Sequence, residues 1–505
     1  MNLIIIILMV LTFISRIIGM GREMTLAYFF GATYISDAYL MSIAIPTIIV
    51  TFIIVSVATS YIPIYQKLPS EVDVGLKFTN KVIGFSFLLC IAILIFSLLF
   101  TPLIVSLFVS GFDPDALELT VDLTRLTLLA IFFMTLNHIL NSFLQVKEKV
   151  LLASLSGLPF NIISIIFIII SARIGVQFLA YGTIAAIGIQ TIYLLILAYF
   201  QGFKLKPIIS IKDKNIKNLI ILAMPIMLAN GVEQVGIIVD KNLASGFGPG
   251  AVSALSYATR TTTAISGIVI TSFLIVTFPK IAKYCAKREM KSMKLALSES
   301  IVGMSLFIIP AIIAITIFAQ PVISLLFGRG AFDDVAVVTT SNLLLFYVYF
   351  LFGNGLTQLF SRVFFALEDS KTPMIVSTIT VILNIIFNLI FTSFMGISGL
   401  ALATSASSMI GLCLIVYLLR RKIGVLALKN AMTSLFKIFG ASLAMSFIAF
   451  AIFEYLLPFA AGFSLIISAI IGVGIYIILL LFARIPEVEH LIGIIFNYLK
   501  KFLKV

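Results

Sequence analysis

The sequence predicts an all-α polytopic membrane protein with fourteen transmembrane helices. Hydrophobic residues make up 61% of the 505 residues and charged residues only 11%, a balance that excludes soluble enzymes and disordered chains. Apolar runs of about 20 residues, the length that crosses a bilayer as a helix, recur from one end of the chain to the other. Runs such as 84–109 and 462–483 are apolar on every side, whereas the strands of a membrane barrel alternate.

Polar residues, glycines and prolines divide the apolar sequence into spans. The first span has neither the basic start nor the small-residue cleavage site of a signal peptide, so we expect it to be the first helix. Spans longer than about 20 residues are expected to tilt, kink or project beyond the headgroups. Six spans cover 3–30, 36–66, 78–108, 116–145, 150–172 and 177–200. Eight more cover 216–246, 251–281, 296–327, 334–366, 372–394, 397–420, 430–456 and 461–483.

The distribution of Lys and Arg predicts the orientation. Of the 34 basic residues, 25 fall in the tail and the connections on the N-terminal side, two in the opposite connections and seven within spans. By the positive-inside rule we expect both termini in the cytoplasm, as an even number of helices requires. The net charge of +13 then reflects topology and attraction to anionic membrane lipids, and no basic stretch indicates nucleic-acid binding.

Comparison of the chain with itself indicates a duplication at an offset of about 217–223 residues. Matched pairs, in the same order in both copies, are Phe30-Gly31 with Phe247-Gly248, YIPIYQK (61–67) with TFPKIAK (277–283), LFVSGFD (107–113) with LFGRGAFD (326–333), and Asn161 with Asn384. We therefore expect two six-helix lobes related by a pseudo-two-fold axis along the membrane normal. The expected divisions are an N-lobe at 1–201, a C-lobe at 202–422, a pair of extra helices at 423–485 and a cytoplasmic interfacial amphipathic tail at 486–505.

Charged residues within the predicted spans mark a candidate anion site. Burying a charge in a bilayer costs at least about 2.5–3.5 kcal/mol per residue, so such residues usually face a wet cavity. The group comprises Ser15, Arg16, Arg22, Glu23, Asp37 and, in the eighth span, Arg260. Arginine binds phosphate oxygens bidentately, so three arginines converging on a cavity would suit a pyrophosphate-bearing substrate. The alternative is that Glu23, Asp37 or helix-terminal carbonyls pair with Arg16 and Arg22, which then only hold the lobe together.

A second polar group suits a hard cation, which prefers oxygen ligands. Asp240 lies on the seventh span, Asn384 and Asn388 lie one turn apart on the eleventh, and Thr404 lies on the twelfth. The alternative is that these side chains only hydrogen-bond neighbouring helices.

The sequence lacks the motifs of an enzyme. It contains no P-loop, no Ser/His/Asp set and no His/Cys/Asp cluster at metal-ligand spacing. We therefore expect a transporter without a cofactor, driven by an ion gradient or the membrane potential.

Several segments together resemble the MurJ (MviN) lipid II flippases of the MOP exporter superfamily. They are SRIIGMGRE, FGATYISDAYL, VDKNLASGFGPGAVSALSYATR, LLFGRGAF and RVFFALEDSKTPMIVSTITVILNIIFN. The resemblance implies a protein of the bacterial cytoplasmic membrane. Such a protein carries undecaprenyl-pyrophosphate-linked peptidoglycan precursor, lipid II, from the inner to the outer leaflet by alternating access, with a groove for the lipid tail at helices 13 and 14.

The same resemblance implies roles for single residues. It assigns substrate binding to Arg16, Arg22 and Arg260. It assigns sodium binding, as in some members, to Asp240, Asn384, Asn388 and Thr404. Expected partners are lipid II or a related undecaprenyl-pyrophosphate glycan, membrane lipids and cell-wall synthases.

The second span departs from the family pattern. IPTIIVTFIIVS places Val50 and Thr51 at the family's arginine pair and Val55 at its acid, and Asn388 replaces a carboxylate of sodium-binding members. The smaller number of charges leaves open an exporter of another polyprenyl-pyrophosphate-linked oligosaccharide, of capsule or teichoic type. Further alternatives are a multidrug exporter, expected to have acid-dominated lobes, and a non-transport scaffold for cell-wall synthases, which needs no intramembrane arginines.

Overall fold

The computed structural model describes residues 3–69, 71–210, 212–426, 429–458, 461–485 and 488. Across these residues the regular secondary structure is entirely helical, which confirms the all-α class. Twelve helical segments of this part of the chain are long and apolar enough to cross a membrane. Two further helices, α1 and α12, coincide with the first and eighth predicted spans. The exact number of fourteen spans stays a prediction, and the predicted amphipathic face of the tail lies outside the described residues.

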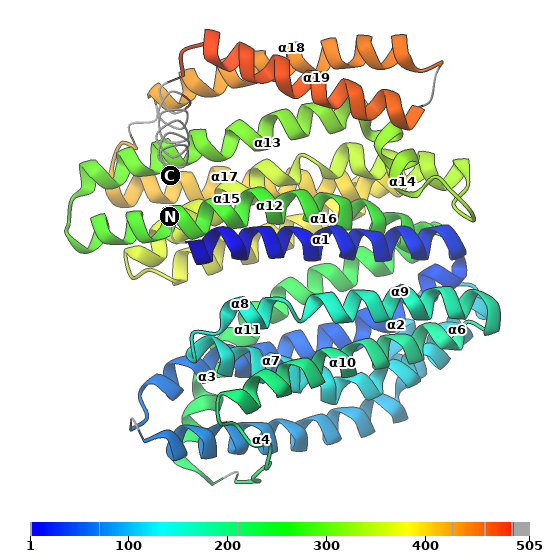
Figure 1. The fold of residues 1–505 in the computed structure, drawn as a ribbon, viewed down its shortest axis with the longest axis vertical. Helices are drawn as coiled ribbons and strands as arrows, with labels where there is room; N and C mark the ends of the chain where they lie inside the picture. Colours follow the sequence, from blue (N-terminus) through cyan, green and yellow to red (C-terminus); the bar gives the residue numbers. More distant parts are fainter. Residues whose placement is uncertain are drawn as a thin grey trace, which may run out of the picture. The chain divides into compact units, whose positions relative to one another are not determined.

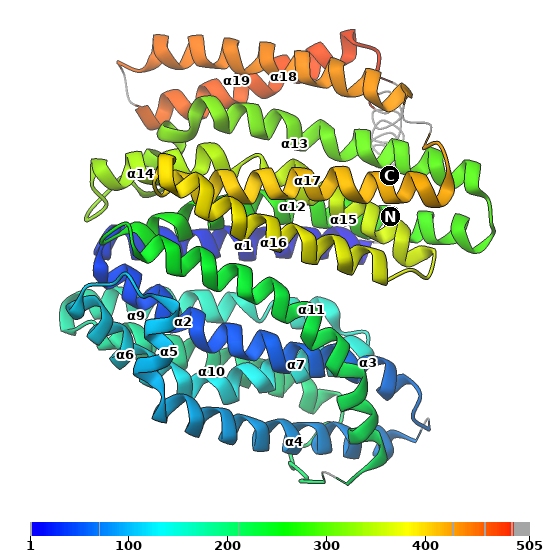
Figure 2. The ribbon, with the colours of Figure 1, turned by 180° about the vertical axis from the view of Figure 1, so that it is seen from behind.

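The chain divides into two compact units, and the first comprises Met1–Tyr257 and Arg329–Ala336. Its segments are α1 (Leu3–Phe30), α2 (Tyr34–Val50), the π-helix η1 (Thr51–Val55), α3 (Ser56–Gln66), α4 (Val72–Leu99), α5 (Thr101–Phe108), α6 (Pro114–Thr127), the 3₁₀ turn η2 (Leu128–Ala130), α7 (Ile131–Val146), α8 (Val150–Ser154), α9 (Gly157–Ile174), α10 (Gln177–Phe200), α11 (Lys214–Ser245) and the start of α12 (Ala251–Ala286) (Figures 1 and 2).

Helix α11 packs within this first unit, although the repeat placed it in the C-lobe. It contacts α3 and η1, and the amide of Asn230 donates a hydrogen bond of 3.1 Å to the Ser56 hydroxyl. Phe52 lies so close to Gly231 that a Cβ there would come within 2.8 Å of its ring. The predicted boundaries after residues 201 and 422 stay predictions.

Proline and glycine explain several interruptions of the predicted spans. Pro102 stands in the first turn of α5 and separates it from α4, because proline cannot supply the backbone donor of a helix interior. Gly31 and Gly248, aligned in the predicted repeat, have left-handed φ angles of 61° and 91°. Glycine adopts this conformation without a Cβ penalty, so each copy leaves its first helix through an equivalent turn.

Residues 204–208, which follow α10, are hydrogen-bonded to α4. Asn80 donates to the carbonyl of Lys204 (3.0 Å) and accepts from the backbone N–H of Lys206 (2.7 Å). The backbone N–H of Ile208 donates to the carbonyl of Asn80 (3.0 Å). Lys81 donates to Asp213 (2.6 Å), a hydrogen bond that holds the pKa of the Asp213 carboxyl below its ordinary value.

The second unit comprises Ala258–Gly328 and Val337–Val505. Its segments are the rest of α12, α13 (Met290–Phe327), most of α14 (Asp334–Tyr347), α15 (Phe350–Ala366), α16 (Lys371–Met395), α17 (Ser398–Ile423), α18 (Lys429–Leu456) and α19 (Ala461–Phe482). Helices α18 and α19 form a hairpin on α13 (Figure 1), where the Tyr476 hydroxyl donates to the carbonyl of Leu306 (2.9 Å). Helix α13 is kinked at Phe318, three residues before Pro321, as expected of a proline inside a helix.

Two charged side chains fix the start of α16. Lys422 donates to the carboxylate of Asp369 (2.5 Å), which also accepts from the backbone N–H of Thr372 (3.0 Å). These hydrogen bonds, led by that of Lys422, lower the pKa of Asp369 to about 2.

Candidate functional site

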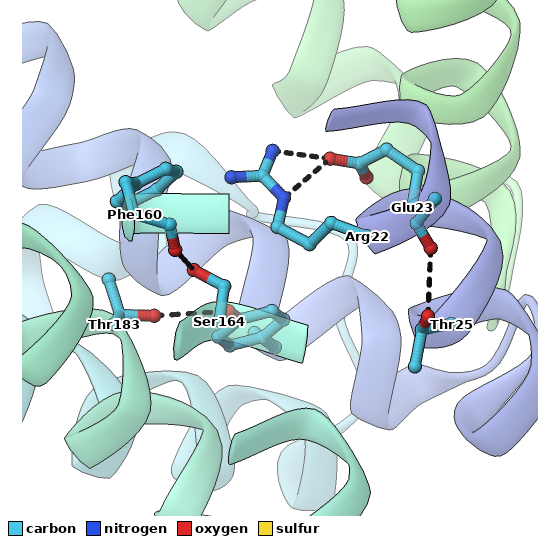
Figure 3. Close-up of polar contacts among 8 residues, drawn as sticks. Arg22, Glu23, Thr25, Phe160, Ser164 and Thr183 are labelled. Carbon is cyan, nitrogen blue, oxygen red and sulfur yellow. Dashed lines mark hydrogen bonds and ion pairs between the residues drawn. The ribbon is translucent and has the colours of Figure 1, made fainter. Parts of the chain in front are cut away.

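Arg22 of α1 forms an ion pair with its sequence neighbour Glu23. Both Nη2 (2.5 Å) and Nε (3.2 Å) of Arg22 donate to one carboxylate oxygen of Glu23, and Figure 3 shows the guanidinium turned toward that oxygen. The Glu23 side chain is 5% exposed and that of Arg22 is 21% exposed. The guanidinium carbon also lies 5.1 Å from the centre of the Phe160 ring, within cation–π range. Glu23 and Phe160 therefore hold the Arg22 guanidinium in place while part of the side chain remains accessible.

Two glycines bring the polar turn of α1 against α9. A Cβ on Gly19 would come within 3.5 Å of the Asn161 amide, and a Cβ on Gly157 would come within 2.9 Å of the Ser15 hydroxyl. Arg16 lies next to Ser15 on α1 and is partly buried. Ser15 and Arg22 of the predicted group thus lie at the contact of α1 with α9, and Asn161 lies there too.

Asp37 belongs to α2, and its side chain contacts the first turn of α12. It is fully buried, and its two carboxylate oxygens accept from the backbone N–H groups of Gly250 and Ser253 at 2.6 Å each. A carboxylate at this place caps the helix and complements its dipole. These bonds give Asp37 a structural role, and its predicted contact with substrate stays a prediction.

Arg260 follows in the part of α12 that belongs to the second unit. It is partly buried, and Thr261 and Thr262 after it are buried. The hydroxyls of Thr262 and Thr263 donate to the carbonyls four residues earlier in the same helix. The three predicted substrate arginines are thus divided between the units, and their convergence stays a prediction.

Three of the four predicted cation ligands form one hydrogen-bonded group in the second unit. The Asn384 amide donates to the Thr404 hydroxyl (3.2 Å), and the Asn388 amide donates to the Asn384 side-chain oxygen (3.4 Å). The fourth, Asp240, lies on α11 of the first unit. Within the described residues no cluster of three His, Cys, Asp or Glu side chains is suited to a metal.

The second span supplies no charge where the family pattern has it. Val50 is buried among Ile54, Cys90 and Leu128. Thr51 and Val55 are the first and last residues of the π-helix η1. A substrate therefore meets neither a guanidinium nor a carboxylate from this stretch.

The structure adds two residues to the predicted site. Asn161 had one signal in the sequence, its alignment with Asn384 in the repeat. Phe160 beneath Arg22 had none, because an aromatic residue in an apolar span is indistinguishable from one that packs in the core.

Comparisons with known proteins agree on one family. The family model described as "Lipid II flippase MurJ" matches residues 26–470. A probable lipid II flippase MurJ of Thermotoga maritima is 28% identical over 488 residues, which cover 95% of this chain and 96% of the relative. One of Rickettsia prowazekii is 27% identical over 414 residues, or 80% of each chain.

Solved structures agree with these relatives. A lipid II flippase MurJ in an inward closed conformation matches with a TM-score of 0.81 and 27% identity, over 94% of this chain and 98% of that one. An inward-facing multidrug transporter of the MATE family, in the MOP superfamily, matches with a TM-score of 0.68 and 16% identity over 84% of this chain and 98% of its own. The latter likeness extends to the fold alone.

Proposed function

Since this chain belongs to the lipid II flippase MurJ family, we propose that it carries lipid II from the inner to the outer leaflet of the bacterial cytoplasmic membrane. It is a multi-span membrane transporter and not an enzyme. The proposed transport proceeds by alternating access with both termini in the cytoplasm, the orientation that the 25 basic residues of one side favour.

The observation that supports this substrate is the Arg22 and Glu23 pair within a membrane helix. A buried charge pair that served only stability could be replaced by apolar residues at little cost. Arg22 keeps 21% of its side chain exposed, and a guanidinium binds two phosphate oxygens at once without ever deprotonating. We propose that Arg22, Arg16 and Arg260 bind the pyrophosphate. Ser15 and Asn161 would line the part of the site formed by α1 and α9.

Complementation tests the proposal. The gene is expressed in a bacterium depleted of its own lipid II flippase, and we expect growth and normal cell shape to return. Arg16→Ala and Arg260→Ala should abolish growth while the protein still accumulates in the membrane, and Arg→Lys should rescue poorly because bidentate geometry is lost. A wild-type chain that accumulates in the membrane without restoring growth would reject lipid II as its substrate.

One observation favours a second candidate, export of another polyprenyl-pyrophosphate-linked oligosaccharide. Val50, Thr51 and Val55 leave the second span without a charge at these three positions, so a substrate with fewer anionic groups than lipid II would lose less binding here. Rescue of a strain that lacks a capsule or teichoic-type exporter, without rescue of the lipid II strain, would select this candidate.

We also propose sodium as the coupling ion. The Asn384, Asn388 and Thr404 group offers neutral oxygens of the kind hard cations accept, and Asp240 is the predicted charged ligand. An ion couples to transport only by binding one conformation more tightly than the other.

A further inference from the structure

A cavity of about 830 Å³ lies within the first unit, away from the arginines of α1. Its walls come from the end of α2, η1, α4, α5 and α11. The residues that line it include Phe52, Ala92, Phe96, Phe108, Leu228 and Val235. The space exceeds by more than fivefold the roughly 150 Å³ at which an engineered apolar cavity already takes up benzene.

The contact between η1 and α11 borders the cavity. Gly231 meets Phe52 there, and the next residue back, Asn230, is bonded to Ser56. The π-helix η1 departs from regular α-helix geometry, and Pro225 within α11 removes one backbone donor of that helix. Both features lie in segments that line or adjoin the cavity, where η1 and α11 do not pack together along their whole length.

Water does not suit this space. A buried water needs two to four polar partners, and the side chains of the wall offer only Gln234 and Ser97 as polar groups. Phe96 and Leu228 of the wall are exposed, so the space is open to its surroundings, and apolar side chains without neighbouring atoms lose dispersion contacts. Hydrocarbon is the remaining filling.

The cavity is continuous with the surface that the spans present to the bilayer. Phe96 is 60% exposed and Leu228 71% exposed, and both lie within segments apolar enough to cross a membrane. A chain from the surrounding lipid can therefore reach the cavity without crossing a polar barrier.

We propose that this cavity binds an acyl chain of a membrane phospholipid. None of the wall residues is charged, so the wall suits a hydrocarbon chain and no headgroup, and phospholipid acyl chains are the hydrocarbon that surrounds the exposed wall residues Phe96 and Leu228 in a bilayer. The chain fills the space between α4 and α11 and stabilises the packing of α11 on the first unit. The proposal does not depend on the identity of the transported substrate.

The experiment uses full-length protein in vesicles of phosphatidylethanolamine and phosphatidylglycerol. A small fraction of the phospholipid has a photoactivatable diazirine in its acyl chain. The protein is solubilised in detergent, washed to remove loosely held lipid and irradiated, and adducts are located by peptide mass spectrometry. We expect adducts on the wall segments of α4 and α11, and competition by excess unlabelled phospholipid.

Two variants fill the cavity from opposite walls, Ala92→Phe on α4 and Val235→Phe on α11. Each should reduce these adducts at least about fivefold, because an added side chain overpacks an occupied space. Ile95→Phe is the matched control, since Ile95 lies on α4, is exposed and does not line the cavity. It should leave the adducts unchanged, and gel filtration verifies that all three variants fold.

Three results would overturn the proposal. The first is a washed wild-type protein without adducts on the wall segments. The second is adduct formation that neither folded filling variant reduces. The third is competition by undecaprenyl phosphate but not by phospholipid, which would assign the cavity to the polyprenyl tail. If a filling variant misfolds, the other variant and the wild-type competition decide.

Discussion

The ion pair of Arg22 with Glu23 allows a direct separation of a structural role from a substrate role. Replacing Arg22 by Gln removes the two hydrogen bonds to the Glu23 carboxylate at 2.5 and 3.2 Å. Breaking a buried pair by removing one partner costs about 3–5 kcal/mol. The 21% exposure of Arg22 places the expected loss near the lower end of that range, about 3 kcal/mol.

The double variant Arg22→Gln/Glu23→Gln removes both charges and keeps two amides of similar size. It should recover most of the stability lost by the single variant, because a neutral pair leaves no carboxylate in a low-dielectric site. We expect its melting temperature in detergent to approach that of the wild type, with the single variant several degrees lower.

The growth that the double variant supports should distinguish the two roles of Arg22. If Arg22 binds pyrophosphate, the double variant accumulates and melts normally but fails to support growth of flippase-depleted cells. If Arg22 serves only Glu23, the double variant grows as well as the wild type. Wild-type growth of the double variant would therefore refute the assignment of Arg22 to the substrate, whatever the stability measurements show.

Three further predictions concern orientation, the ion and a surface pair. In a background without native cysteines, Pro249→Cys should react with an impermeant thiol reagent in intact cells and Ser210→Cys should not; labelling of Ser210→Cys from outside would invert the topology. Sodium should raise the melting temperature of the wild type relative to potassium at equal ionic strength, and Asp240→Asn should erase the difference; identical melting curves in the two salts would remove sodium from consideration. Lys422 lowers the pKa of Asp369 to about 2, so its stabilising effect is fully present above the ordinary carboxyl pKa near 4 and is lost as the pH falls toward 2. Lys422→Met should accordingly lower stability at pH 6 and have a much smaller effect at pH 2, and an equal effect at both values would contradict the pairing.

The positions of the helices follow from the sequence because the length of an apolar run and its Gly and Pro boundaries are local properties. Gly31 and Gly248 illustrate this, since a glycine after an apolar run signals the end of a helix from composition alone. The π-helix at 51–55 was not foreseen, because TFIIV has no composition that separates it from ordinary helix. The assignment of α11 to the first unit also depends on packing, which a repeat in sequence does not encode.

The sequence offered Glu23 and Asp37 as alternative partners of Arg16 and Arg22, and the structure pairs Glu23 with Arg22. Spacing alone does not select between these partners, because neighbouring side chains on a helix do not face each other. The long guanidinium of Arg22 nevertheless reaches back to Glu23. The bonds of Asp37 to Gly250 and Ser253 join residues more than 200 positions apart, and no periodicity reports such a contact.

The clamped connection after α10 changes how the two copies of the repeat are joined. A flexible linker would give them a statistical separation that grows with the square root of its length. Here Asn80 holds the backbone of Lys204 and Lys206, and a Cβ on Gly84 would come within 2.4 Å of the carbonyl oxygen of Ile208. Residues 204–208 therefore belong to the packed surface of α4, and a reporter domain inserted at Ile208 would break the hydrogen bond of the Ile208 backbone N–H to Asn80. A chain split for expression in two pieces should keep residues 203–210 with the N-terminal piece.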